Sequence, residues 1–205
     1  MATRGYRQAA RAEQMRANVD RVIGSAVSLV KKTRRTADIT LDDMARDSGV
    51  TVRTILRRFG SREGVLEAAF GQIKTEFKGY RQPTPPGDVS AAVRALLDQY
   101  ELIGELNMRA LEQEQQLPLL HRALTEARRS HREWLIETFG PALAGLPPAE
   151  REGRLDALYA ATDVYLWKLL RRDLKLDRAA AEATFERLVR GVLTLPATPN
   201  GKRRK

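Results

Sequence analysis

Residues 47–63 read DSGVTVRTILRRFGSRE, and this stretch decides the fold of the N-terminal part of the chain. Gly49 follows a short helical pattern and suits the left-handed conformation of a tight turn. Thr51 then precedes a run in which Ile55 and Phe59 recur at helical spacing. The stretch therefore predicts two short helices joined by a four-residue turn.

The spacing around this turn matches the helix-turn-helix unit, whose last helix lies in the major groove of DNA. Ala45 is small where the two helices would cross, and Gly49 can make the turn four residues later. Ile55 is apolar where the last helix would meet the core. A helical hairpin chosen at random meets one or two of these conditions and seldom all three.

The helix that starts after Thr51 divides into two faces when it is drawn at about 100° per residue. Its polar residues share one arc: Arg53, Thr54, Arg57 and Arg58. Its apolar residues Ile55 and Phe59 lie opposite, with Val52 and Leu56 at the edges. This arrangement offers donors to phosphates and bases on one side, although an arginine-rich face that meets only water is the plainer alternative.

Basic residues are concentrated near the N-terminus of this 205-residue chain, whose net charge is +10. Residues 1–80 carry 16 Lys and Arg against 9 Asp and Glu, whereas residues 81–201 carry 16 against 17. Clustered positive charge attracts phosphate backbones. A basic segment joined to a neutral one is thus typical of a polyanion-binding module attached to a domain with a separate role.

The composition excludes several classes of protein. The chain has no cysteine, which rules out disulfides, thiolate metal sites and cysteine nucleophiles. No apolar stretch approaches the roughly 20 residues needed to cross a bilayer, and the N-terminal residues lack the apolar core of a secretory signal. We therefore expect a globular protein that stays in the cytoplasm.

Helical periodicity dominates the chain, and no stretch alternates long enough to predict a strand. Proline and glycine interrupt the pattern at 79–88 and 140–149. We predict an all-α fold with four segments: a basic N-terminal arm (1–14), a three-helix helix-turn-helix domain (15–78, with its motif at about 40–59), a second helical domain (79–195) and a basic tail (196–205).

Two helix starts carry capping residues. Thr40 is followed three residues later by Asp43, an arrangement that resembles a capping box. Asp177 precedes the last helix in the same way. Residues 155–170 are apolar at helical spacing and predict one continuous helix that ends at a charged turn.

Residues 39–70, ITLDDMARDSGVTVRTILRRFGSREGVLEAAF, resemble the DNA-binding segment of the TetR family of bacterial transcriptional regulators. The match is carried by residues of the helix starts, the turn and the start of the fourth helix: Thr40, Ala45, Gly49, Val50, Thr51, Phe59, Ser61, Arg62 and Glu63. The resemblance implies a ligand-responsive repressor without a cofactor that binds a palindromic DNA operator as a homodimer.

The resemblance also implies which residues contact DNA. Phosphates would be held by Thr40, Thr51, Arg57 and Arg62, and base edges would face Val52, Arg53, Thr54 and Leu56. We expect Arg53 to make a bidentate contact with guanine.

Two positions depart from the family pattern. Leu56 stands where Tyr is usual, so a hydroxyl that reaches the DNA backbone is replaced by a group suited to a thymine methyl. Arg62 stands where Lys is usual, which keeps the charge near the start of the fourth helix.

The basic residues near the N-terminus have two interpretations. Arg4, Arg7, Arg11 and Arg16 lie ahead of the first helix or in its opening turns. They could form an arm that reaches an adjacent DNA groove, or a mobile tail that only improves solubility.

The second helical domain is expected, from the resemblance, to bind a small-molecule effector and to form the dimer. Candidate pocket residues are Tyr100, Met108, Trp134, Phe139, Tyr165 and Trp167. Candidate dimer-interface residues are Leu166, Leu169, Leu170, Val189 and Leu193. For both sets the alternative is that the side chains are ordinary core.

An enzymatic function has little support in the sequence. His121 and His131 are the only histidines, and on one helix they lie about 80° apart and over about a dozen ångströms apart along the axis. They are too far apart to share a metal, and no glycine-rich phosphate loop follows a strand. We expect no enzyme activity and no metal.

A second candidate function is a sequence-tolerant architectural DNA-binding protein that uses the same basic segment without an effector. Its affinity would fall with salt but would hardly vary with DNA sequence. The sequence leaves open the operator, the effector and the choice between repressor and activator.

Overall fold

The computed structural model describes residues 2–78 and 84–196, and at 2–5, 7, 77 and 78 only the backbone. Every regular element in these ranges is helical, which confirms the predicted all-α fold class. The described chain forms two compact units. We call them the head, which comprises residues up to 78 and 109–123, and the body, which comprises 84–108 and 124–196.

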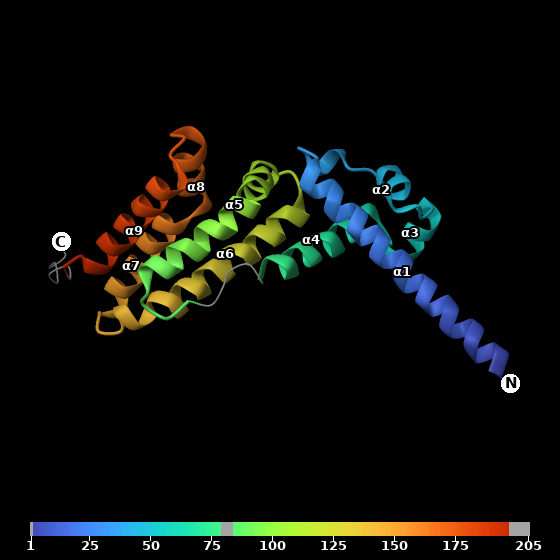
Figure 1. Cartoon of the computed structure of the whole chain (residues 1–205), viewed down its shortest axis with the longest axis horizontal. Coiled ribbons are helices and arrows are strands. Elements are labelled where there is room, and N and C mark those ends of the chain that lie inside the picture. Colours follow the sequence, from blue (N-terminus) through green and yellow to red (C-terminus); the bar gives the residue numbers. More distant parts are fainter. Residues whose placement is uncertain (1, 79–83, 197–205) are drawn as a thin grey trace, which may run out of the picture. The chain divides into compact units, whose positions relative to one another are not determined.

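The head contains the first helices of the chain (Figure 1). These are α1 (Ala2–Lys32), the short η1 (Thr36–Asp38), α2 (Leu41–Ser48), α3 (Val52–Phe59) and α4 (Arg62–Lys78). α1 packs against α2 and α4, and α3 also packs against α2 and α4. Their shared core consists of apolar side chains: Val22, Ala26, Val27, Ile39, Met44, Ile55, Val65, Leu66 and Ala69.

Two long helices run through both units. α5 (Val89–Gln113) belongs to the body as far as Met108, and α6 (Pro118–Phe139) belongs to the head as far as Ala123. A domain boundary near residue 79 therefore assigns residues 109–123 to the second domain, although they belong to the head. None of the helices in the described ranges is both long and apolar enough to span a bilayer.

The rest of the body consists of η2 (Gly140–Leu143), α7 (Pro148–Thr162), α8 (Val164–Lys168), the π-helical turn η3 (Leu169–Asp173) and α9 (Arg178–Thr194). α7 packs against α9. As predicted, Asp177 caps α9, because its carboxylate accepts the backbone N–H of Ala180 at 2.7 Å. The predicted tail lies outside the described residues except for Pro196.

Asp163 divides the stretch that the periodicity predicts as one helix. Its backbone is extended (φ −72°, ψ 154°), and its carboxylate accepts the backbone N–H of Tyr165 at 2.9 Å. The prediction of a continuous helix over 155–170 is therefore wrong. An aspartate can end one helix and cap the next while the apolar spacing on both sides stays helical.

The body core is organised around the indole of Trp167, which is fully buried. A Cβ atom on Gly104 of α5 would lie 2.4 Å from Cζ3 of this indole, so only glycine allows the observed approach. The indole Nε1 donates to the Glu101 carboxylate at 3.2 Å, and the guanidinium of Arg172 lies 4.4 Å from the ring centroid. Apolar packing and two charged groups thus hold α8 on α5.

Replacing Gly104 by alanine is expected to destabilise the body. The new Cβ forces Trp167 or α5 to move, and overpacking of a buried site costs about 1–3 kcal/mol. Removing a glycine from a helix gains about 1 kcal/mol at most. Urea unfolding followed by circular dichroism should therefore show a lower free energy of unfolding.

Gly153→Ala is the matched control, because Gly153 lies in α7 of the same unit and its added Cβ would meet nothing within 4 Å beyond its chain neighbours and the backbone of its own helix. This variant should be neutral or slightly stabilised. Equal stability of the two variants would contradict the tight packing of Trp167 on Gly104.

Candidate nucleic-acid interface and ligand pocket

The turn between α2 and α3 is built around Gly49 as its sequence predicts, but three residues separate the two helices instead of the predicted four. Gly49 ends α2 at φ 66°, and its N–H donates to the carbonyl oxygen of Ala45 at 3.0 Å. Thr51 then caps α3 by accepting the backbone N–H of Thr54 at 3.4 Å. Any other residue type at Gly49 would be strained, so this position fixes the direction in which α3 leaves the turn.

Thr40 and Asp43 form the predicted capping box at the start of α2. The Asp43 N–H donates to Thr40 Oγ1 at 3.1 Å, and the Thr40 N–H donates to Asp43 Oδ2 at 3.1 Å. The Thr40 hydroxyl donates to the same carboxylate oxygen at 2.6 Å. A contact between Thr40 and a phosphate stays a prediction. The Thr40 hydroxyl proton is already donated to the Asp43 carboxylate.

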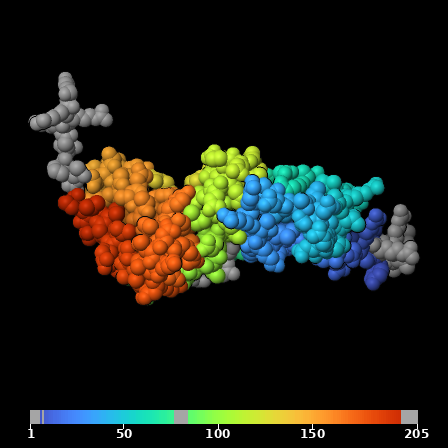
Figure 2. All heavy atoms as spheres, turned by 90° about the horizontal axis from the view of Figure 1, so that it is seen from above, coloured from blue at the N-terminus to red at the C-terminus, as the bar shows by residue number. Residues whose placement is uncertain are grey.

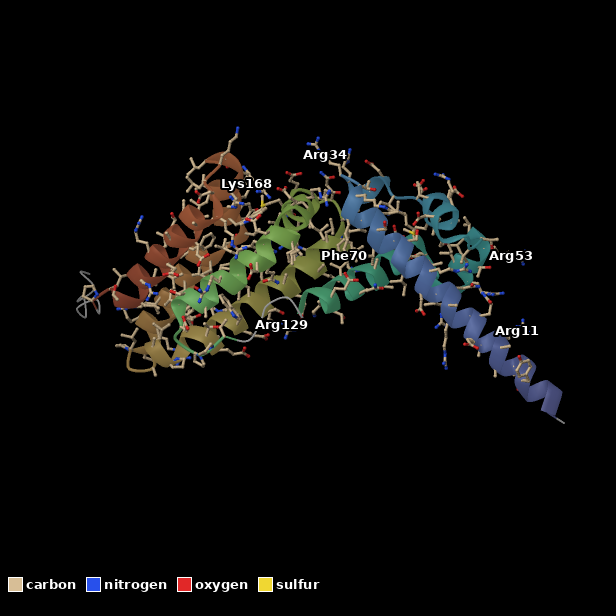
Figure 3. The ribbon with its side chains drawn as sticks, in the orientation of Figure 1. Arg11, Arg34, Arg53, Phe70, Arg129 and Lys168 are labelled. Atoms are coloured by element: carbon tan, nitrogen blue, oxygen red, sulfur yellow. The ribbon has the colours of Figure 1, made fainter. Side chains whose placement is uncertain are left out.

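α3 turns one face to the core of the head and the other to solvent. Ile55 is 1% exposed and Phe59 is half-buried. Arg53, Arg57 and Arg58 are exposed, and none of them has an ion-pair partner among the described residues. Figure 3 shows Arg53 at the outer edge of α3. The positive charge of this face is therefore not neutralised within the described chain.

The edges of the exposed face are less polar. Val52 and Thr54 are half-buried, Leu56 is 39% exposed, and the Thr51 hydroxyl donates to that of Thr54 at 3.0 Å. All four residues predicted to face bases thus lie on one short helix. Of the predicted phosphate contacts, Arg57 lies on α3 and Thr51 is the residue that caps it.

Arg62 is placed differently from the arginines of α3. It is the first residue of α4, and its side chain is 22% exposed. Its guanidinium donates to three backbone carbonyl oxygens of residues 36–39 and to the carboxylate of Glu63. The phosphate contact of Arg62 stays a prediction, and the described contacts of this side chain lie within the head.

The N-terminal part of α1 is a helix with no described packing partner. The structure has residues 2–32 as one helix, so the segment predicted as an arm is helical from Ala2 onward. Arg11 and Arg16 are exposed, as is Met15. Figures 1 and 3 show that this part of α1, with Arg11 on it, extends beyond α2, α3 and α4. The side chains of Arg4 and Arg7 lie outside the described residues.

The predicted pocket residues separate into three kinds of environment. Phe139 and Trp167 are fully buried and Tyr100 is 5% exposed, whereas Tyr165 is 57% exposed. Met108 and Trp134 are half-buried. Two pairs are in ring contact: Tyr100 with Trp167 at 6.3 Å between centroids, and Trp134 with Phe139 at 5.9 Å.

A buried polar cluster, which no sequence pattern predicts, links these two aromatic pairs. The Thr162 hydroxyl donates to the carbonyl oxygen of Leu158 at 2.7 Å, so Nε2 of His131, 2.9 Å from that hydroxyl, acts as the donor. The Tyr100 hydroxyl donates to the Thr162 carbonyl oxygen at 2.8 Å. The His131 ring also stacks on Trp134, with 5.4 Å between centroids.

Asp163 and Tyr159 add ionisable groups to this region. Burial raises the pKa of the Asp163 carboxyl, although the Tyr165 N–H and the charge of Arg128 act in the opposite direction. Burial also raises the pKa of the Tyr159 hydroxyl, and the negative charge of Asp163 adds to that shift. The Tyr159 ring meets His131 edge to face at 5.0 Å.

The predicted dimer-interface residues also differ in their exposure to solvent. Leu170 and Val189 are buried in the core, Leu166 and Leu193 are half-buried, and Leu169 is 44% exposed. Further large apolar residues are exposed: Tyr165 of α8, Leu188 of α9 and Leu195 directly after α9. Leu169 is therefore the predicted interface residue most accessible to a second copy.

The two histidines lie in unlike environments. His131 is 7% exposed, and His121 is exposed with its Nδ1 3.2 Å from Glu114 Oε1. Within the part of the chain that the structure describes, no group of three or more His, Asp and Glu side chains could hold a metal ion.

No protein-family model matches the chain, and no curated protein matches it. Among solved structures, the crystal structure of a transcriptional regulator from Rhodococcus sp. Rha1 is similar, with a TM-score of 0.65 and 14% sequence identity. The similarity covers 85% of this chain and 95% of that chain. The chain therefore shares its fold, over most of its length, with a transcriptional regulator.

The capping box makes the stability of α2 depend on pH. The bonds from Thr40, the hydroxyl bond first, hold the pKa of the Asp43 carboxyl below its ordinary value. Ionised Asp43 therefore stabilises the native state above about pH 4. This contribution is lost as the pH falls through the lowered native pKa.

Asp43→Asn tests this dependence. We expect wild type to have the higher urea midpoint at pH 6, and the difference between the two proteins to disappear near pH 2 as Asp43 becomes protonated. A difference that is the same at both pH values would contradict the linkage.

Proposed function

We propose that the chain is a sequence-specific DNA-binding transcriptional regulator. The observation that carries the proposal is the exposed face of α3, where Arg53, Arg57 and Arg58 have no acidic partner among the described residues. Ile55 fixes the opposite face in the core, and the Gly49 turn fixes the approach of α2. A rigid helix with unneutralised arginines on its outer side suits the major groove.

The proposed contacts divide by chemistry. Thr51 and Arg57 hold phosphates and set the register, while Arg53 and Thr54 read base edges together with Val52. Leu56 presents an apolar group beside them and suits a thymine methyl. Thr40 and the exposed end of α1 add backbone contacts at the edges of the site.

The finer parts of the proposal follow from the resemblance of residues 39–70 to the TetR family. In this proposal the protein is a ligand-responsive repressor that binds a palindromic operator. Two copies are needed because one helix-turn-helix unit contacts only a few base pairs and a dimer matches the symmetry of the operator.

The effector would bind in the body beside His131, Thr162 and Tyr100. Ligand pockets combine apolar and aromatic walls with a few well-placed polar groups, and this cluster has that composition with Trp134 against it. An effector that binds one arrangement of the body more tightly would shift the population of DNA-binding forms.

Selection of DNA fragments by the purified full-length chain tests the function. We expect a palindromic site to be enriched, and Arg53→Ala to lose preference at one position of each half-site, a loss of about 1–3 kcal/mol of discrimination. Sequencing of the selected fragments and titration of matched and mismatched sites measure both effects.

Arg151→Ala is the control for charge, because Arg151 is exposed in the body on α7. It should leave the preferred site unchanged. Binding that falls with salt but enriches no site would contradict the regulator and favour the architectural alternative.

Sedimentation tests the dimer. We expect wild type to sediment as a dimer and Leu169→Glu to weaken the association about tenfold or more, since burying a leucine contributes about 1.5–3 kcal/mol. Leu102→Glu is the control, because Leu102 is 59% exposed but lies on α5, outside the proposed interface. A monomeric wild type would contradict the dimer.

A further inference from the structure

The segment between α1 and α2, residues 33–40, is held from two sides, and we call it the connector. It contains η1 and ends at Thr40, the cap of α2. One holder is Arg62 at the start of α4, and the other is Gln113 at the end of α5. Both holders belong to the head.

Arg62 binds the connector through its backbone carbonyl oxygens. Its Nε donates to Ile39 at 2.5 Å, and its Nη2 donates to Thr36 at 2.7 Å and to Ala37 at 3.0 Å. Its Nη1 donates to Glu63 at 2.9 Å. A guanidinium has five N–H donors, so these four bonds leave at most one N–H for any other partner.

Gln113 binds the other side of the same connector. Its Oε1 accepts the backbone N–H of Thr36 at 2.8 Å, and its Nε2 donates to the Arg34 carbonyl oxygen at 3.2 Å. Gln113 is 6% exposed, so this amide pairs a buried backbone donor. Figure 2 shows the yellow-green atoms near residue 110 in contact with the blue atoms near residue 35.

The hydrogen bonds of Arg62 join the two ends of the helix-turn-helix, so the chain from the connector to Arg62 forms a closed loop. From the connector the chain passes through α2, the Gly49 turn and α3, and only Gly60 and Ser61 separate α3 from Arg62. The guanidinium then returns to the connector 23 to 26 residues earlier in the chain. The angle between α2 and α3 therefore depends on this closure as well as on the buried Ile55.

We propose that Arg62 is a positioning residue for DNA binding, which fixes the connector and thereby the placement of α2 and α3 instead of holding a phosphate. The inference rests on the proposed DNA-binding function. Gln113 supports the same placement from the opposite side of Thr36. A buried glutamine cannot reach DNA, so Gln113 acts on affinity indirectly, through its two bonds to the connector and its bond to the Arg109 carbonyl oxygen of α5 at 2.8 Å.

Lysine at position 62 separates positioning from phosphate contact. A lysine keeps the positive charge and can still meet a phosphate, but its single ammonium group cannot span three carbonyl oxygens and a carboxylate as the planar guanidinium does. If Arg62 held a phosphate, Arg62→Lys would retain affinity. Arg62→Gln would then make the dependence of affinity on salt shallower by about one counterion.

The experiment titrates the selected DNA site at several salt concentrations with wild type, Arg62→Lys, Arg62→Gln and Gln113→Ala of the full-length chain. We expect both Arg62 variants to lose about tenfold or more in affinity while the salt slope stays that of wild type. Gln113→Ala should lose affinity in the same way. The paired control is Arg57→Lys and Arg57→Gln, which should show the phosphate pattern.

Two results would overturn the inference. One is an affinity of Arg62→Lys within about twofold of that of wild type. The other is a slope of log affinity against log salt concentration that is shallower by about one in Arg62→Gln alone. If Arg62→Gln does not fold by circular dichroism, Arg62→Lys and Gln113→Ala decide, and wild-type affinity in either of them overturns the inference. A wild type that binds no DNA fragment contradicts the proposed function itself, so the two failures are distinguishable.

Discussion

The arrangement of the head depends on the guanidinium of Arg62, which joins the start of α4 to the connector between α1 and α2. Closing a chain of this length by noncovalent bonds has an entropic cost that grows only slowly with length, so a few hydrogen bonds with good geometry can hold it. Inside this closed loop, the Gly49 turn and the buried Ile55 set the exit of α3. The exposed arginines of α3 are therefore presented by a rigid frame.

The body buries large aromatic and charged side chains whose polar atoms are paired by hydrogen bonds. The Trp167 indole is paired with Glu101, and His131 is paired with Thr162. Arg154 of α7 is 5% exposed and donates to three carbonyl oxygens at the end of α9 and to Glu150. These bonds satisfy groups that would otherwise destabilise the interior, and they tie together helices far apart in sequence.

The parts of the head that follow from local rules were predictable from the sequence. The Thr40 and Asp43 cap, the left-handed Gly49 and the buried Ile55 each depend on residues within one turn or two. The connector carbonyls that Arg62 binds lie 23 to 26 residues away, and the connector groups that Gln113 binds lie 77 and 79 residues away. No periodicity or spacing encodes such bonds, because they depend on how the helices pack.

The residues predicted to line a pocket show the same limit. Aromatic residues of α5, α6 and α8 could be named from composition, but the periodicity gave no means to separate buried Trp167 from exposed Tyr165, two positions earlier. The break at Asp163 rotates the following residues relative to α7, and that break is a local choice of an aspartate side chain. His131 and Thr162 carry no sequence signal that distinguishes a buried pair from two surface residues.

Arginine count alone overstates the charge that the head can offer to DNA. Arg62 is the first residue of α4, where the positive end of the helix dipole disfavours a cation unless acceptors lie nearby. The connector carbonyls and Glu63 supply those acceptors and use most of its donors. In the proposed complex, the arginines of α3, the described arginines at the exposed end of α1, and Arg34 and Arg35 of the connector are exposed and contribute to the field that a phosphate backbone meets. At position 62 a positive charge alone could be supplied by lysine. The proposed positioning role requires a guanidinium, because only its planar set of N–H donors matches the connector carbonyls and Glu63.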